Sequence, residues 1–393
     1  MADVKVLIPD LDFVRELKNS GAETLKKCYQ CATCSVVCDI SGDKDPFPRK
    51  EMHMAQWGLK DELLSDSNIW LCHNCNDCSK NCPRGARPAD VLATLRKAVI
   101  KENAFPPILG KLGDTKPLNI FIALLIPVIL LSVVFFTGGR FVMPEGDVIF
   151  SKMFPIHLID LIFMPTAALV VIFFGISIMK FWKNINTEPE KLRASDKKLI
   201  PALLETVLEF VLHKKFSKCG ESKDRTLAHK LVVIGFVLLF IATNWAVFNL
   251  YVIKWESPYP MDDVEALNLF GSLGFMKIYF VAFKLTANIG AISLLIGGGL
   301  LILNRLKVRS YTTLTSSFDW TLIGIVFTVC VSGILSEFTR VANMPNIAYP
   351  IYFVHLVTVF YVIAYAPYSK LAHMGYRLTA ITYAKMAGKD ISE

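Results

Sequence analysis

Six long apolar segments are the feature that most restricts how this chain can fold. They span approximately residues 118–137, 157–181, 228–253, 273–303, 318–336 and 349–370. A hydrocarbon core about 30 Å thick is crossed by roughly 20 helical residues, and these segments reach or approach that length. Lipid offers no hydrogen-bond partners, so a spanning segment must satisfy its backbone internally. We therefore expect six membrane-spanning helices within residues 111–393.

Residues 1–110 are polar and form a separate domain in this interpretation. The first residues, MADVKVLIPDLDF, have neither a basic start nor a long apolar core, so we expect no secretory signal and a cytosolic domain. Eight of the chain's ten cysteines lie between Cys28 and Cys82. In a reducing compartment, such a group favours metal binding over disulfides.

The cysteines form two runs of the same spacing, CYQCATCSVVC and CHNCNDCSKNCP. In bacterial ferredoxins with two clusters, three cysteines at this spacing bind one 4Fe-4S cluster and the fourth binds the other. Zinc is the alternative, but its sites usually join two separated Cys-x-x-Cys pairs. The spacing therefore predicts two interleaved sets: Cys28, Cys31, Cys34 and Cys82 for cluster one, and Cys38, Cys72, Cys75 and Cys78 for cluster two.

The positive charge of the chain follows the membrane segments. The formal net charge of +8 could indicate nucleic-acid binding, but the basic residues gather in loops beside apolar spans. Their distribution predicts a multi-pass protein of the cytoplasmic membrane with both termini in the cytosol, and no nucleic-acid partner. In one inner loop, IPALLETVLEFVLHKKF has an amphipathic pattern that predicts either a helix at the membrane surface or a docking helix.

Four histidines sort into two pairs when the spans alternate in direction. His157 and His355 fall at the outer side, and His229 and His373 at the inner side. Eighteen residues make five helical turns, so one continuous helix would carry His355 and His373 on one face, about 27 Å apart. Imidazole is a common axial ligand of haem iron, and ionisable groups at membrane depth are usually functional. We expect two haems b, each held by one pair.

Two alternatives to this assignment stay open. A histidine near a helix end is often only an interfacial polar residue, and His213 competes for the inner haem. Pro367 lies between His355 and His373 and would kink or end their helix. Buried polar residues also predict a quinone site, with Lys277 and Asp160 as its candidate residues, although Lys277 could instead extend to the outer surface.

The expected fold is thus all-α. A helical ferredoxin-type domain with two 4Fe-4S clusters occupies residues 1–110, and a six-helix transmembrane dihaem cytochrome b bundle occupies residues 111–393. The cysteine runs resemble those of the iron–sulfur C subunits of heterodisulfide reductases. The remainder, including RTLAHKLVVIGFVLLFIAT, is similar to the b-type cytochromes of heterodisulfide reductase E subunits and nitrate reductase gamma subunits.

A fusion in this order resembles the membrane C subunits of quinone-interacting membrane-bound oxidoreductase complexes of sulfate reducers. The resemblance implies menaquinol oxidation, flavoprotein and iron–sulfur partners resembling the heterodisulfide reductase A subunit, and delivery of electrons to adenylylsulfate reductase. Other acceptors, such as heterodisulfide with methanophenazine or a sulfite-reducing system, and reversed electron flow stay open. So does a haem-free membrane anchor with structural histidines.

Overall fold

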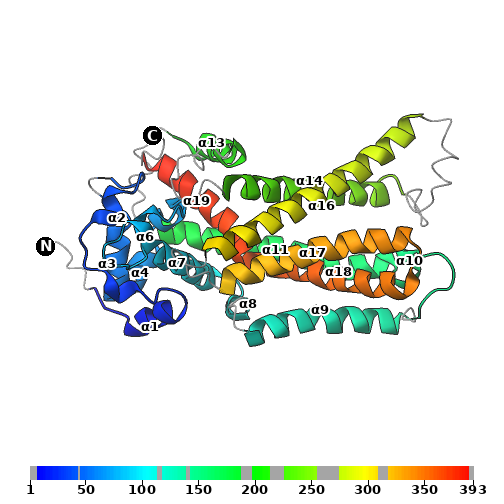
Figure 1. Cartoon of the computed structure of the whole chain (residues 1–393), viewed down its shortest axis with the longest axis horizontal. Helices are drawn as coiled ribbons and strands as arrows, with labels where there is room; N and C mark the ends of the chain where they lie inside the picture. Colours follow the sequence, from blue (N-terminus) through cyan, green and yellow to red (C-terminus); the bar gives the residue numbers. More distant parts are fainter. Residues whose placement is uncertain are drawn as a thin grey trace.

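The computed structural model describes residues 7–42, 45–112, 117–138, 142–186, 197–212, 225–254, 274–308 and 317–388. Within these ranges the regular structure is helical and contains no strand, which confirms the predicted all-α class. Figure 1 shows the short helices of the N-terminal part gathered at one end of an elongated molecule, from which the long helices extend.

The long helices carry the predicted membrane spans. Each contains a stretch that is long and apolar enough to cross a bilayer, which confirms the expectation of six such helices. The sixth differs from its predicted bounds, because the α-helix ends at Tyr365 and not at 370. The six helices are α9 (Pro117–Thr137), α11 (Ile156–Ile185), α14 (Arg225–Tyr251), α16 (Gly274–Val308), α17 (Ser317–Val341) and α18 (Pro345–Tyr365).

Helices α14 and α16 pack with their backbones close together. A Cβ atom on Gly235 would lie 2.8 Å from the carbonyl oxygen of Gly290, and one on Gly297 would lie 2.8 Å from the amide nitrogen of Val232. Small residues allow such contact, and the association of helices in lipid depends on close packing. The glycines therefore account for the pairing of α14 with α16, which run side by side in Figure 1.

Three of the other long helices, α9, α11 and α18, share an aromatic core. Phe135 of α9 meets Phe154, which precedes α11, and Phe163 of α11 meets Phe360 of α18 edge to face. The short helix α10 (Phe150–Met153) adds Phe150, which stacks on Tyr352 with ring centroids 4.1 Å apart. These rings hold α9, α11 and α18 together in one cluster of buried side chains.

The N-terminal domain is built from short helices around a buried apolar core that includes Phe13, Leu63 and Leu95. Short elements suit a domain whose loops must carry eight cysteines. The elements are α1 (Leu11–Asn19), η1 (Leu25–Lys27), α2 (Thr33–Val36), α3 (Arg49–Trp57), α4 (Lys60–Leu64), α5 (Asn68–Leu71), α6 (Asp77–Lys80), α7 (Pro88–Asn103) and α8 (Pro107–Leu112).

Helix α19 (His373–Met386) joins the two parts of the molecule. It follows α18 through two 3-10 turns, η3 (Ala366–Tyr368) and η4 (Lys370–Ala372). Helix α13 (Leu199–Leu212) lies along it, with Lys385 within 3.3 Å of Glu205 and 3.1 Å of Glu209. The opposite, apolar side of α13, including Leu204 and Leu208, is exposed. The predicted amphipathic helix is therefore present, and it contacts α19 through Glu205, Glu209 and Phe210.

Candidate functional site: two cysteine sets and four histidines

The two cysteine loops have the same backbone shape. Gln30 and Ala32 in the first run have φ of 62° and 67°, and Asn74 and Asn76 at the same positions of the second have 56° and 70°. A left-handed conformation is uncommon for residues with a side chain, so the matching pairs indicate one backbone path used twice. Each loop leads into a short helix, α2 or α6, and these two helices contact each other.

The structure gathers the cysteines into two groups. The pKa of the Cys34 thiol is raised to about 11, first by burial and then by the neighbouring cysteines Cys28, Cys82 and Cys31. Burial also raises the pKa of Cys38 to about 12 and that of Cys78, with neighbours drawn from the second run. The first sulfur set is thus Cys28, Cys31, Cys34 and Cys82, and the second is Cys38, Cys72, Cys75 and Cys78. These are the groups that the spacing predicts.

Each sulfur set fits a 4Fe-4S cluster in the number and kind of its ligands. Four cysteine sulfurs come together in each set, and each would bind a different iron of the cluster. The backbone amides of Asn74 and Ala86 each lie 3.3 Å from a sulfur, that of Cys72 and of Cys82 respectively. Amide donors of this kind stabilise a ligating thiolate and tune the reduction potential.

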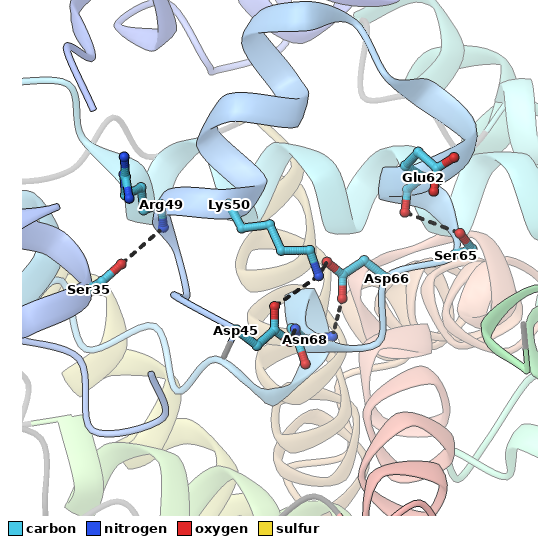
Figure 2. Close-up of polar contacts among 8 residues, drawn as sticks. All are labelled: Ser35, Asp45, Arg49, Lys50, Glu62, Ser65, Asp66 and Asn68. Carbon is cyan, nitrogen blue, oxygen red and sulfur yellow. Dashed lines mark hydrogen bonds and ion pairs between the residues drawn. The ribbon is translucent and has the colours of Figure 1, made fainter. Parts of the chain in front are cut away.

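A polar network holds α3 between the two loops (Figure 2). The Arg49 side chain donates to the carbonyl of Gln30 in the first loop at 3.1 Å. Lys50 lies 2.9 Å from Asp45 and 3.5 Å from Asp66. Burial alone would lower the pKa of Lys50, but the charges of Asp66 and Asp45 raise it. Since Asp66 also accepts from the Asn68 amide at the start of α5, the network connects both loops to one helix.

The structure brings the inner histidines together. The pKa of His373 is lowered, first by desolvation and then by nearby charges that include His229, so the two imidazoles lie close enough to interact. His373 Nδ1 contacts the carbonyl oxygen of Lys370. A neutral imidazole that donates from Nδ1 keeps Nε2 for a metal, the usual arrangement of a histidine ligand. His213, the competing residue, lies outside the described residues.

One continuous helix from His355 to His373 was the wrong expectation. The α-helix stops at Tyr365, and Ser369 is extended, with φ of −100° and ψ of −179°. Pro367 has no N–H to continue the helical hydrogen bonds, and its ring clashes with the preceding turn. The shared face set by five turns therefore does not exist, and His373 begins a new helix, which Figure 1 shows running toward the N-terminal domain.

The outer histidines lie on different packing surfaces. His355 faces α17, where its Nδ1 lies 3.1 Å from both the Val329 carbonyl and the Ser332 hydroxyl oxygen. A Cβ atom on Gly333 would lie 3.0 Å from Cε1 of that ring. His157 is exposed, on the side of α11 away from α18. Their pairing therefore remains a proposal, and it requires a haem between these surfaces.

The candidate quinone residues are only partly described. The Tyr251 hydroxyl, at the end of α14, donates to Asp160 of α11 at 2.5 Å. Asp160 lies one turn after His157, so this contact joins two helices at the level of the outer pair. Sequence reasoning missed Tyr251, because no local pattern distinguishes it from an interfacial aromatic residue. The Lys277 backbone belongs to α16, and its side chain lies outside the described residues.

Two family models match the chain. Residues 24–86 match a 4Fe-4S dicluster domain, which covers both cysteine runs. Residues 113–390 match the model of citrate utilization protein B, which covers all six long helices and α19. The chain therefore carries an N-terminal iron–sulfur domain in front of a membrane part. No solved structure matches it.

Curated relatives match the iron–sulfur part. The C subunit of the H(2):CoB-CoM heterodisulfide,ferredoxin reductase of Methanothermobacter marburgensis is 35% identical over 106 residues, or 27% of this chain and 57% of that protein. A protein of Archaeoglobus profundus, named as similar to the heterodisulfide reductase C subunit, is 36% identical over 89 residues, or 22% of this chain and 47% of that protein. The chain thus spans about half the length of these relatives, and the expected resemblance to heterodisulfide reductase C subunits is confirmed. Because the membrane-part model covers well over half of the sequence, the chain belongs to the citrate utilization protein B family.

Proposed function

We propose that this chain is the quinone-reactive subunit of a respiratory oxidoreductase. It oxidises menaquinol in the bilayer and passes the electrons through two haems b and two 4Fe-4S clusters to soluble partners. The likeness of its first domain to heterodisulfide reductase C subunits supports a role in electron transfer. One observation carries the proposal. Helix α19 begins at His373, which lies near His229, and Arg377 of the same helix contacts His73, next to Cys72 of the second sulfur set, so that α19 connects the inner histidines to this set.

The histidines hold the haems in this proposal. His229 and His373 bind the inner haem, and His157 and His355 the outer one. Carbonyl oxygens at Nδ1 of His355 and His373 orient both rings and leave Nε2 for iron. Haem iron supplies one-electron transfer, which a relay between a two-electron quinol and one-electron clusters needs.

The quinol is proposed to bind near the outer pair. Asp160 accepts a proton from a quinol hydroxyl, and Tyr251 orients its carboxylate. Oxidation of one quinol to quinone releases two electrons and two protons, and the protons leave on the outer side. Lys277 is the second proposed residue of this site, as a cation that polarises a quinone oxygen.

The partners follow from the proposed orientation. With both termini in the cytosol, the sulfur sets meet soluble flavin and iron–sulfur subunits resembling the heterodisulfide reductase A subunit. Adenylylsulfate reductase is the proposed final acceptor. Heterodisulfide reduction is the second candidate function, because the matched relatives carry that activity in their names. The subunits that copurify with the chain distinguish the two.

The test is a difference spectrum of the purified chain, reduced with dithionite and then with a menaquinol analogue. We expect two haems b and about eight iron atoms per chain. Reduction of haem by the quinol analogue supports quinol oxidation. A preparation with iron and sulfide but no b-type band would contradict the haem proposal and leave the anchor function.

A further inference from the structure

Helix α19 makes a polar contact with the second cysteine run. Arg377 Nη2 donates a hydrogen bond of 2.9 Å to Nδ1 of His73, the residue after Cys72. Arg377 follows His373 by four residues, so both side chains lie on one face of α19, one turn apart. The Arg377 side chain thus lies between His373, one of the two inner histidines, and Cys72 of the second sulfur set.

An aromatic stack supports this contact. Trp70 and Tyr376 stack with ring centroids 5.2 Å apart and an angle of 18° between their planes. Phe181, at the end of α11, contacts both rings. All three rings are almost completely buried. From the other side, Arg96 of α7 donates to the Cys72 carbonyl at 2.7 Å. The segment leading to Cys72 is therefore held between α7, α11 and α19.

The first cysteine run has a different environment. Tyr29 and Val36 are 69% and 84% exposed, and Cys31 is exposed as well. Arg84 lies over the Tyr29 ring, 4.1 Å from its centroid. Tyr29 and Cys31 are thus more exposed than the equivalent residues of the second run, His73 and Cys75, which are partly buried, whereas Lys80, the equivalent of Val36, is exposed as well.

We propose that Arg377 is a positioning residue that holds the second sulfur set beside the inner histidines. The inference rests on the proposed function, because it assumes haem at His229 and His373. With a haem at His229 and His373 and a cluster on the second sulfur set, the contact would serve the transfer of one electron from the haem iron, which is oxidised, to the cluster, which is reduced. No covalent bond forms or breaks.

The test compares three single variants and one double variant, Arg377→Met with His73→Leu, of the full chain in lipid nanodiscs, loaded with haem and clusters. Arg377→Met and His73→Leu each remove one side of the hydrogen bond, and Arg84→Met is the matched control at the exposed loop. Hydrogen exchange reports how often α5 and α19 open. Mixing a haem-reduced sample with an oxidant of the clusters reports the rate of haem reoxidation through them.

Loss of a hydrogen bond to a charged group should make exchange in α5 about tenfold faster in both variants. Haem reoxidation should be slower in both, because the second sulfur set is no longer held in place. The double variant should resemble either single one, because both changes remove the same bond. Arg84→Met should alter neither measurement.

Two results would overturn the positioning role. One is unchanged exchange and reoxidation in Arg377→Met and His73→Leu with haem intact. The other is loss of the inner haem in Arg377→Met while His73→Leu behaves as wild type, since Arg377 would then serve only the haem. A wild-type protein that binds no haem would instead contradict the proposed function. In that case hydrogen exchange alone would test the contact between Arg377 and His73.

Discussion

Lys370 forms an ion pair with Asp319, which connects the turn before His373 to the first turn of α17. Asp319 is 16% exposed and also lies 3.3 Å from Arg305 of α16. Because the Lys370 carbonyl is the partner of His373 Nδ1, one carboxylate fixes the break in the helix and the position of the histidine that follows.

Asp319→Asn should loosen the inner haem. Removing one member of a largely buried ion pair leaves the other charges uncompensated and costs about 2–3 kcal/mol. We expect a lower thermal midpoint and a shifted or partly lost spectrum of one haem. Asp12→Asn is the control, since Asp12 and Arg15 form an exposed ion pair that contributes little to stability. Equal effects of the two changes would contradict the role of Asp319.

Gly333→Val should displace His355. Its Cβ would lie 3.0 Å from the imidazole, and two added methyl groups leave the ring no room in its position against α17. We expect selective loss of the outer haem, measured as about half the b-type absorbance. Gly324→Val on the same helix is the control, because nothing lies within 4 Å of its Cβ position. Full haem content in Gly333→Val would refute the placement of this ligand.

Cys34→Ser and Cys38→Ser should disable different clusters although the residues are four apart. Cys34 belongs to the first sulfur set and Cys38 to the second. Loss of one thiolate ligand should remove or alter one cluster and leave the other. Electron paramagnetic resonance of the reduced variants should therefore show complementary spectra. The same spectrum from both variants would mean that each run binds its own cluster.

Glu51→Gln should flatten the dependence of stability on pH. Glu51 of α3 is completely buried, and burial first, then the charge of Asp66, raises its pKa well above the usual range. The folded chain therefore keeps a proton that the unfolded chain releases above about pH 4.3. The contribution of Glu51 to the free energy of unfolding is therefore largest below that pH, and it falls as the pH rises toward the pKa of Glu51 in the folded chain.

Wild type should thus lose stability relative to Glu51→Gln as the pH rises above about 4.3, as measured by thermal midpoints. Glu23→Gln, at an exposed position, is the control and should follow wild type. Parallel curves for wild type and Glu51→Gln would show that Glu51 is ionised in the folded chain.

Prediction from sequence succeeded where the physics is local. Each span was recognised from its own residues, because crossing lipid depends on length and apolar character within one segment. The ligand sets of the two clusters stay a prediction from spacing, which rests on three ligands of a cluster lying within one short loop. Pro367 was identified as the weak point of the long helix, and the helix ends two residues before it.

The amino-acid sequence by itself determined the all-α class and the six apolar helices, and its cysteine spacing predicts both sulfur sets. Only the tertiary structure decided that His373 begins a separate helix, that His355 faces α17, and that Arg377 meets His73 across 304 positions of sequence. Such contacts depend on how helices pack after they form, and that packing is set by many weak side-chain contacts between distant segments, which leave no local pattern.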